Sequence, residues 1–301
     1  MLLTIAIPSH NGVKNICQTL DSIFMQTPDE ILSKVKVLVC DNGSSSPLLQ
    51  GISSNYLNRE NLEIKTFDDN LGYDLNLLRM LQQCKSEYIW LRGDDDLILP
   101  NSIKLLFELL KNSKYSALLM MPIYEKSSLN YVLEQSNGRE VQNGKDFFNE
   151  VFYDASLLSS LVFRTDKLPQ IPSKLIGKNW VHVVILALIC EEAELPFYRF
   201  TKPCVQRIDS DPQRWNDHFQ SEFFSGLSHV LVLFYFRQLV EKETFLYFLD
   251  KRMPRPITFF KSFKYIRSSR YKVLVIYLFY KLGVIYRRKL LLKIFLLLKN
   301  H

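Results

Sequence analysis

The first 110 residues alternate between short apolar runs and segments with helical spacing, and this alternation restricts the fold more than any other feature. Apolar runs bounded by turn residues are typical of buried strands, and apolar residues repeating every three or four positions are typical of helices. Strands are predicted at residues 2–7, 35–40, 62–67 and 85–91, and helices at residues 16–24, 71–81 and 102–110. Because strands that alternate with helices usually pair in parallel, we expect an α/β fold with a mainly parallel central sheet.

The patterns after residue 116 are weaker. Strands are predicted at residues 118–121 and 157–164 and helices at residues 181–190 and 227–239, whereas residues 203–222 are polar and predict irregular structure. In the helix at residues 71–81, we expect Leu75, Leu78 and Leu81 to share the face that packs against the core.

Polar residues follow three of the predicted strands directly, at residues 8–11, 41–42 and 94–96. In open α/β sheets, ligands bind in the crevice at the carboxyl ends of the strands. We therefore expect these three polar loops to form one site.

Three consecutive aspartates, Asp94, Asp95 and Asp96, come directly after the apolar run YIWL. Carboxylates on such a turn are suited to hold a divalent ion together with the phosphate oxygens of a substrate, and the structural alternative is a solvated acidic turn. The letters Gly93-Asp94-Asp95 also match a turn of template-dependent RNA polymerases. That class requires a larger chain and a basic channel, and residues 1–250 are net acidic.

Charge is divided unevenly along the chain. Residues 251–301 contain 14 Lys and Arg and no Asp or Glu, which leaves 24 basic and 31 acidic residues in the first 250. The longest uncharged apolar run of this tail, residues 273–280, is far shorter than the about 20 residues of a spanning helix. A tail that mixes cations with Phe, Leu and Ile predicts contact with an anionic membrane surface, and packing of helices on the rest of the chain is the alternative.

Five scattered cysteines without a CxxC pair predict buried thiols in a reducing compartment. The chain begins with TIAIPSHN after three residues, so no secretory signal peptide is expected.

The first hundred residues resemble the four successive blocks of family 2 glycosyltransferases. The blocks read TIAIPSHNGVKNICQTLDSIFMQ, VKVLVCDNGSSS, DDNLGYDLNLL and EYIWLRGDDDLILP. With Gly93 where many members have an aspartate, WLRGDDD is most similar to the abequosyltransferase-like branch of bacterial surface-polysaccharide enzymes. The resemblance implies the GT-A nucleotide-diphospho-sugar transferase fold over residues 1–225, with a nucleotide-sugar-binding half (1–115), an acceptor-side half (116–225) and a helical C-terminal region (226–301).

The resemblance also assigns donor-binding roles to individual residues. Asp41 would read the imide or ribose of the nucleotide, or would only shape the Asn-Gly turn. His10 would stack on the base, or would only support its own loop. The donor-binding residues that the resemblance implies are Pro8, His10, Asn11, Asp41, Asn70, Gly72, Arg79 and Asp94, with Arg79 substituting for a basic residue that is usual later in the loop.

For the metal, the resemblance implies Asp95 as a ligand of Mn²⁺ or Mg²⁺, with Asp96 and His218 as further candidates. Arg207 or Arg214 would bind the diphosphate, or their segment would be a solvated loop. Many family members place an acidic general base before the helix at residues 181–190, but this chain has Asn179 there. His182 could replace that base, because its pKa normally lies near physiological pH, and Asp154 is a second candidate.

These observations predict a glycosyltransferase, inverting if the resemblance holds, at the inner face of the bacterial cytoplasmic membrane. It would transfer a sugar from a nucleotide-diphosphate sugar to a lipid-linked or polysaccharide acceptor, as in lipopolysaccharide or capsule synthesis. A degenerate GT-A protein serving as a membrane scaffold is the alternative from another class, since no acid replaces the expected base. A sugar nucleotidyltransferase is a third alternative, but the chain has no glycine-rich, lysine-bearing loop near its start.

Overall fold

The structure is a computed structural model and describes residues 1–123, 138–177, 179–207, 234 and 239–241. Contacts within the chain divide it into two units, Met1–Phe219 and Gln220–His301. All strands and complete helices that the structure describes belong to the first unit. The predicted helix at residues 227–239 lies largely outside the described residues, the basic tail lies wholly outside them, and the predicted domain limits stay a prediction.

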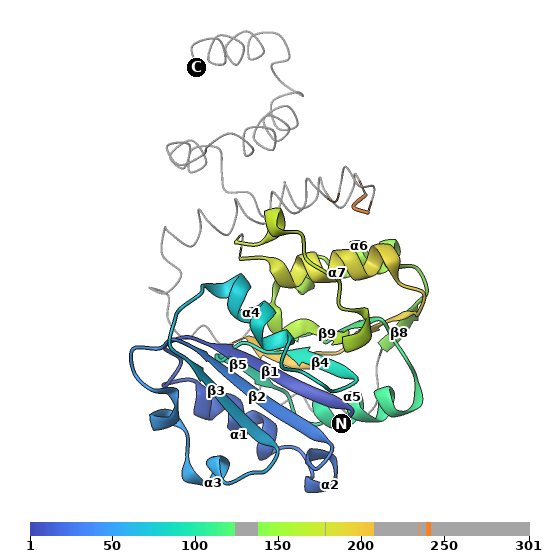
Figure 1. Ribbon diagram of the computed structural model, residues 1–301. Helices are drawn as coiled ribbons and strands as arrows, with labels where there is room; N and C mark the ends of the chain where they lie inside the picture. Colours follow the sequence, from blue (N-terminus) through green and yellow to red (C-terminus); the bar gives the residue numbers. More distant parts are fainter. Residues whose placement is uncertain (124–137, 178, 208–233, 235–238, 242–301) are drawn as a thin grey trace, which may run out of the picture. The chain divides into compact units, whose positions relative to one another are not determined.

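The elements of the first unit follow the predicted alternation (Figure 1). The strands are β1 (Leu3–Ser9), β2 (Val35–Asn42), β3 (Leu62–Phe67), β4 (Tyr88–Leu91), β5 (Asp96–Ile98), β6 (Ala117–Leu119), β7 (Pro122–Ile123), β8 (Gly138–Val141), β9 (Leu161–Arg164), β10 (Phe197–Phe200) and β11 (Val205–Arg207). The α-helices are α1 (Ile16–Phe24), α2 (Asp29–Leu32), α3 (Ser54–Leu57), α4 (Tyr73–Leu81), α5 (Ser102–Asn112), α6 (Gly144–Val151) and α7 (Val181–Glu192). The predicted α/β class is confirmed.

The strands form a large sheet with the order β3-β2-β1-β4-β9-β6-β10-β8 and a small sheet with the order β5-β11-β7. The strands β3, β2, β1 and β4 are parallel, and β9 enters antiparallel between β4 and β6. The register pairs Ser9 at the end of β1 with Asp41 near the end of β2. The polar residues that follow these strands therefore lie at one edge of the large sheet.

Helices cover both faces of the large sheet: α4, α6 and α7 lie on one face, and α1 and α5 lie on the other (Figure 1). The apolar residues of α1 and α5 form one core cluster with alternate residues of β1 and β2. Every residue of α7 from Val181 to Cys190 is buried, because the helix is apolar on all sides and contacts both α4 and α6. Within the described residues, no helix is both long enough and apolar enough to cross a bilayer.

Three predictions about individual segments were wrong. The buried face of α4 contains Asp74, Leu77 and Leu81, whereas Leu75 is 44% exposed. Residues 205–207, which were predicted to be irregular, form β11, because their backbone pairs with β5 and β7. The predicted strand at residues 157–164 is a strand only from Leu161, since two 3₁₀ turns, Asp154–Ser156 and Leu158–Ser160, come before it.

Candidate active site

The three predicted polar loops meet at the carboxyl edge of β1, β2 and β4. Ser9 Oγ donates a hydrogen bond of 2.6 Å to Asp94 Oδ2, which ties the end of β1 to the turn after β4. His10 Nδ1 lies 3.0 Å from the carbonyl oxygen of Asn42, which ties β1 to the end of β2. The prediction that these loops lie together is confirmed.

Asp94 is buried beneath the loop that connects β1 to α1. A Cβ atom at Gly12 would lie 2.0 Å from Asp94 Oδ2 and 2.3 Å from Ser9 Oγ, so only glycine lets this loop come so close. Thr19 Oγ1 of α1 donates to the carbonyl oxygen of Asp94 at 2.8 Å. The position of Asp94 is thus fixed from β1 and from α1.

Asp95 and Asp96 lie in different environments. Asp95 is partly exposed, whereas Asp96 is 3% exposed and accepts a hydrogen bond from Ser159 Oγ. Burial raises the pKa of Asp96 to about 6, and the positive charge of Arg92 opposes that shift. Asp95 is therefore the most accessible of the three carboxylates, and Asp96 points into the protein.

Arg92 is fully buried behind this turn. Its Nη2 donates to the carbonyl oxygen of Asp96, while its Nε and Nη1 have no hydrogen-bond partner among the described residues. Burial lowers the pKa of Arg92 to about 10, and the nearby carboxylates of Asp96 and Asp95 oppose the shift. A buried guanidinium is costly without opposite charge, so Arg92 and the aspartates stabilise one another.

A network of amide side chains holds the loop at residues 70–72. Asn42 Nδ2 donates to Asn70 Oδ1 at 2.8 Å, and Asn70 Nδ2 in turn donates to His10 Nε2 at 3.1 Å. Arg79 Nη2 donates to Asn42 Oδ1 at 3.0 Å, and its guanidinium lies 3.3 Å from the centre of the Phe67 ring. The structure thus brings together the predicted donor-binding residues of β1 and of this loop, with Arg79 bound to Asn42 beneath them.

Asn11 and Asp41 form hydrogen bonds with nearby residues of the chain. Asn11, with a φ of 55°, accepts hydrogen bonds from Ser45 N at 3.0 Å and from Ser45 Oγ at 3.1 Å. Asp41 is 1% exposed, and its two oxygens accept hydrogen bonds from Ser44 and from Leu48 N. This geometry corresponds to the turn-shaping alternative for Asp41, and its contact with a nucleotide stays a prediction.

His182 is enclosed on all sides at the start of α7. Its Nδ1 lies 3.1 Å from the hydroxyl of Tyr73, its Nε2 lies 3.4 Å from the carbonyl oxygen of Ser156, and its ring stacks on Trp180. Because a carbonyl only accepts, Nε2 carries the proton, Nδ1 accepts from Tyr73, and the ring is neutral. Burial lowers the pKa of His182 to about 4.

Asp154, the second predicted base, lies in the same 3₁₀ turn as Ser156, and its Oδ2 is 3.7 Å from Nη2 of Arg199. Like His182, Asp154 is buried. Asp154 therefore lies in the turn at residues 154–156, and His182 contacts that turn. The next 3₁₀ turn, Leu158–Ser160, contacts the turn that carries Asp94, Asp95 and Asp96 (the aspartate turn) through the hydrogen bond from Gly93 N to Ser159 Oγ.

The environment of His182 predicts a pH-dependent stability. The unfolded chain binds a proton at His182 below about pH 6.5. The folded chain binds it only below the lowered pKa of about 4. The free energy of unfolding therefore decreases as the pH falls from about 6.5 to about 4. From pH ~7 to pH ~5, wild type should lose about 2 kcal/mol more stability than His182→Gln. Urea unfolding of both proteins at each pH measures this difference. Protonation of Asp96 has the opposite effect on stability, but it occurs in both proteins and so does not affect their difference. Equal losses of stability in wild type and His182→Gln would contradict the prediction.

Metal binding can be tested against the chemistry of the available oxygens. Among the described residues, no three His, Cys, Asp or Glu side chains are grouped as a complete protein shell for a metal ion. Mg²⁺ and Mn²⁺ prefer hard oxygen ligands, and Mg²⁺ in particular is usually held by one or two carboxylates plus substrate phosphates. The turn at residues 93–95 supplies such carboxylates beside the site, so the residues present fit a divalent metal that arrives with a phosphorylated substrate.

Arg207, the last residue of β11, pairs in register with Asp96 and so lies beside the aspartate turn. The other residues predicted for this segment, Arg214 and His218, lie outside the described residues.

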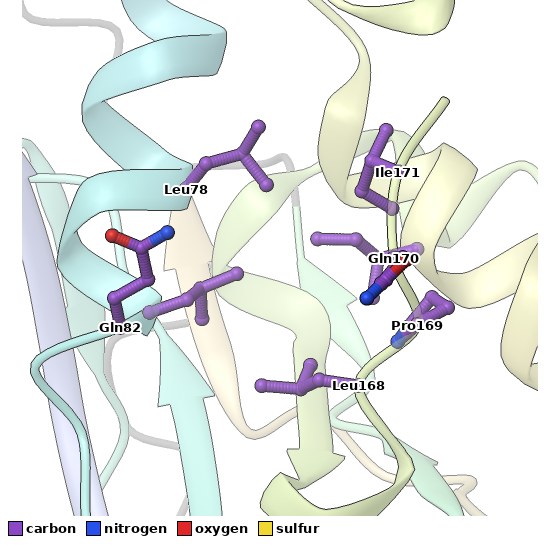
Figure 2. Close-up of a pocket in the computed structure, with 8 residues that line it drawn as sticks. Leu78, Gln82, Leu168, Pro169, Gln170 and Ile171 are labelled. Atoms are coloured by element: carbon purple, nitrogen blue, oxygen red, sulfur yellow. The ribbon is translucent and has the colours of Figure 1, made fainter. Parts of the chain in front are cut away.

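A cavity of about 470 Å³ lies away from these residues, between α4 and the segment at residues 168–171 (Figure 2). Its lining is mostly apolar and consists of Leu78, Leu81, Gln82, Leu168, Pro169, Gln170, Ile171 and Ile185. None of the predicted site residues belongs to this lining.

The sequence analysis missed four residues that organise the site: Arg92, Ser159, Tyr73 and Asp74. A sequence signal existed for two of them. Arg92 is a charged residue directly after a buried strand, and Asp74 is an acid within the first turn of a predicted helix. Ser159 and Tyr73 become recognisable only through their partners, Asp96 and His182, which are more than 60 residues away in the chain.

Two curated relatives resemble the chain. The uncharacterized glycosyltransferase MG060 of Mycoplasma genitalium is 23% identical over 200 residues, which cover 61% of this chain and 67% of that protein. An uncharacterized glycosyltransferase of Mycoplasma pneumoniae, a homolog of MG025, is 30% identical over 106 residues, which cover 34% of each chain.

Solved structures share the fold at low sequence identity. S. aureus TarS 1–349 is 18% identical with a TM-score of 0.58, over 77% of this chain and 65% of that one. The mannosyltransferase PcManGT from Pyrobaculum calidifontis, solved with GDP-Man and Mn²⁺, is 14% identical with a TM-score of 0.53, over 99% of this chain and 80% of that one. The chain thus spans just under two thirds of TarS 1–349, and these likenesses support a GT-A-like fold.

The family follows from the sequence itself. Residues 4–163 match the glycosyl transferase family 2, and this range contains more than half of the chain and all three polar loops, at residues 8–11, 41–42 and 94–96. The chain therefore belongs to glycosyl transferase family 2.

Proposed function

We propose that the protein transfers a sugar from a nucleotide-diphosphate sugar to a lipid-linked or polysaccharide acceptor during synthesis of a bacterial surface glycan. The observation that carries the proposal is the meeting of Ser9, His10, Asn70 and the aspartate turn at the carboxyl edge of a family 2 fold. The complexes of TarS with UDP-GlcNAc and of PcManGT with GDP-Man, two proteins of similar fold, support this class of donor.

Each of these groups has a proposed task in donor binding. The loops at residues 8–11 and 41–42 would border the nucleotide base, with Asp41 supporting its loop from below. Asp94, held by Ser9, would face the ribose or the sugar, and Asp95 would hold Mn²⁺ or Mg²⁺ together with the donor's diphosphate. When bound, the metal would act as a Lewis acid that stabilises the charge of the leaving diphosphate. Arg207, whose backbone pairs with Asp96, would add a positive charge to that stabilisation.

An inverting transfer needs a group that accepts the proton of the attacking hydroxyl. His182 is neutral, as a base must be, but both of its ring nitrogens are engaged, so a proton would reach it through the hydroxyl of Tyr73. Asp154, whose Oδ2 lies 3.7 Å from Nη2 of Arg199, could instead accept the proton directly on its carboxylate. Comparing the turnover of His182→Ala with that of Asp154→Asn decides between these two bases.

The acceptor and the location are proposed from charge. The net acidic residues 1–250 carry a basic tail whose cations are interleaved with Phe, Leu and Ile, and this composition supports contact with the anionic inner face of the cytoplasmic membrane. The presence of Gly93 in WLRGDDD supports the abequosyltransferase-like branch, and the transferred sugar would be a hexose or a deoxyhexose.

The donor can be identified by a thermal-shift screen of UDP-, GDP-, CDP- and dTDP-sugars with Mn²⁺, followed by an assay of hydrolysis of the stabilising compound. A nucleotide-sugar transferase should be stabilised by one nucleotide class and should slowly hydrolyse that sugar donor when Mn²⁺ is present. Binding without hydrolysis or transfer would favour the scaffold alternative, and the absence of any binding would contradict the proposed function.

Removal of residues 251–301 should release the protein from anionic vesicles. Each cation that reaches the surface contributes about 1 kcal/mol, and inserted apolar side chains add a contribution that salt does not screen. Binding of the full chain should therefore weaken at high salt without vanishing. Co-sedimentation with neutral and anionic liposomes at low and high salt measures both effects. Equal sedimentation of the full and shortened chains would show that the tail is not the membrane contact.

A further inference from the structure

The turn before α7 is held by a residue of α4 that is about 100 positions earlier in the chain. Asp74 Oδ2 accepts hydrogen bonds from Gly177 N at 2.8 Å and from Asn179 N at 3.0 Å. Asp74 Oδ1 accepts a third from Val181 N at 3.1 Å. Asp74 is 3% exposed, so its charge is stabilised by these backbone groups and not by water.

The helix α7 has no cap of its own. The side chain of its N-cap residue, Trp180, makes no capping hydrogen bond, and Gly177 and Asn179 have φ values of 80° and 60°. Backbone N–H groups in such left-handed turns point toward a common centre and attract an anion. The carboxylate of Asp74 occupies that centre, and it also lies at the positive end of the α7 dipole.

Tyr73 makes a second connection between the same two helices. Its hydroxyl bonds to His182 Nδ1 at 3.1 Å, and its ring meets the His182 ring edge to face at 5.8 Å. Consecutive residues of α4 thus hold two successive parts of the 177–182 segment. Through the contact of His182 Nε2 with the carbonyl oxygen of Ser156, this segment also touches the turn at residues 154–156.

The N-terminal end of α4 follows directly after the loop at residues 70–72. Gly72 N bonds to Asn70 Oδ1 at 2.9 Å, and Asn70 bonds to Asn42 and His10. These contacts do not involve Asp74, so the loops that are proposed to bind the donor are held in place independently of Asp74. One short piece of chain, residues 70–74, therefore connects the donor-side loops to the turn at residues 177–181.

We propose that Asp74, assisted by Tyr73, is a positioning residue that fixes the turn at residues 177–181 relative to the donor-side loops, and so determines how the acceptor binds. Only the statement about acceptor binding rests on the proposed glycosyl transfer. Replacement of the carboxylate by an amide removes the negative charge and turns one of its two acceptor oxygens into a donor, so the N–H groups of Gly177, Asn179 and Val181 can no longer all be satisfied. The turn then reorganises, while the loop at residues 70–72 keeps its contacts.

The test compares Asp74→Asn and Tyr73→Phe with Asp146→Asn. Asp146 is an exposed acid in the first turn of α6, so its replacement controls for the loss of a charge at a helix start. In Asp74→Asn, hydrogen exchange of the Gly177, Asn179 and Val181 amides should be about tenfold faster, the scale expected for loss of a helix cap. Tyr73→Phe should act in the same direction with a smaller effect, and Asp146→Asn should have none.

Three measurements, two on the donor and one on the acceptor, distinguish positioning from general loss of structure. In Asp74→Asn, the Kd of the sugar nucleotide and its Mn²⁺-dependent hydrolysis should stay within about twofold of wild type, whereas the KM of the acceptor should rise about tenfold or more. Unchanged exchange at residues 177–181, or a rise in donor Kd equal to the rise in acceptor KM, would overturn the inference. A wild-type protein that binds no sugar nucleotide would instead contradict the proposed function, and the exchange measurement would still decide whether Asp74 holds the turn. If Asp74→Asn does not fold, the exchange criterion alone applies to Tyr73→Phe, which removes the hydroxyl that bonds to His182.

Discussion

Replacement of Asp95 by alanine should lower turnover by about 10³-fold or more, because a metal at a transferring phosphoryl or glycosyl group contributes several kcal/mol to the transition state. Asp95 is the most accessible carboxylate of the aspartate turn, since Asp94 and Asp96 are buried and accept hydrogen bonds from Ser9 and Ser159. Its side chain is therefore free to change without disturbing the packing behind the turn. The thermal unfolding temperature should stay close to that of wild type.

The measurements are turnover with the identified donor and binding of Mn²⁺ followed by electron paramagnetic resonance in the presence of the nucleotide. Asp29→Ala is the matched control, because the side chain of Asp29 is 91% exposed and lies 3.6 Å from Arg59. Near-normal turnover of Asp95→Ala in the presence of EDTA would exclude the metal role. Loss of turnover with unchanged Mn²⁺ binding would assign the effect of Asp95 to another step.

Arg92→Met should destabilise the fold by about 3–5 kcal/mol, because it leaves the buried Asp96 without its opposite charge. Arg92 is fully buried and Asp96 is 3% exposed, so water cannot replace the lost partner. The double variant Arg92→Met with Asp96→Asn should recover part of this loss, since asparagine is neutral and its oxygen can still accept from Ser159. Urea denaturation of the two single variants and the double variant measures the coupling.

A surface arginine provides the control for Arg92. Arg59 lies over the Phe24 ring at 4.7 Å and pairs with the exposed Asp29, and Arg59→Met should cost only about 1 kcal/mol or less. The mutual stabilisation of Arg92 and Asp96 would be contradicted if Arg92→Met lost as little unfolding free energy as Arg59→Met. It would also be contradicted if the double variant were as unstable as Arg92→Met alone.

The sequence by itself determined the α/β class and the place of the site. Apolar runs of four to eight residues that end at turn residues are typical of buried strands, and both the runs and the turn residues appear directly in the sequence. The parallel order of β1, β2 and β4 then requires residues 8–11, 41–42 and 94–96 to meet at one edge, as they do. Each of these conclusions depends on residues that are close in the chain.

Contacts between distant residues decided the rest. The sequence shows three equivalent aspartates, and only the tertiary structure makes them different, because Ser9 and Gly12 enclose Asp94 while Arg92 and Ser159 face Asp96. Likewise, apolar periodicity in α4 favoured Leu75 as a core residue. The structure buries Asp74 instead, since the three N–H groups before α7 compensate its charge. The cost of burying a charge depends on partners brought by other elements, and those partners exist only once the chain has folded.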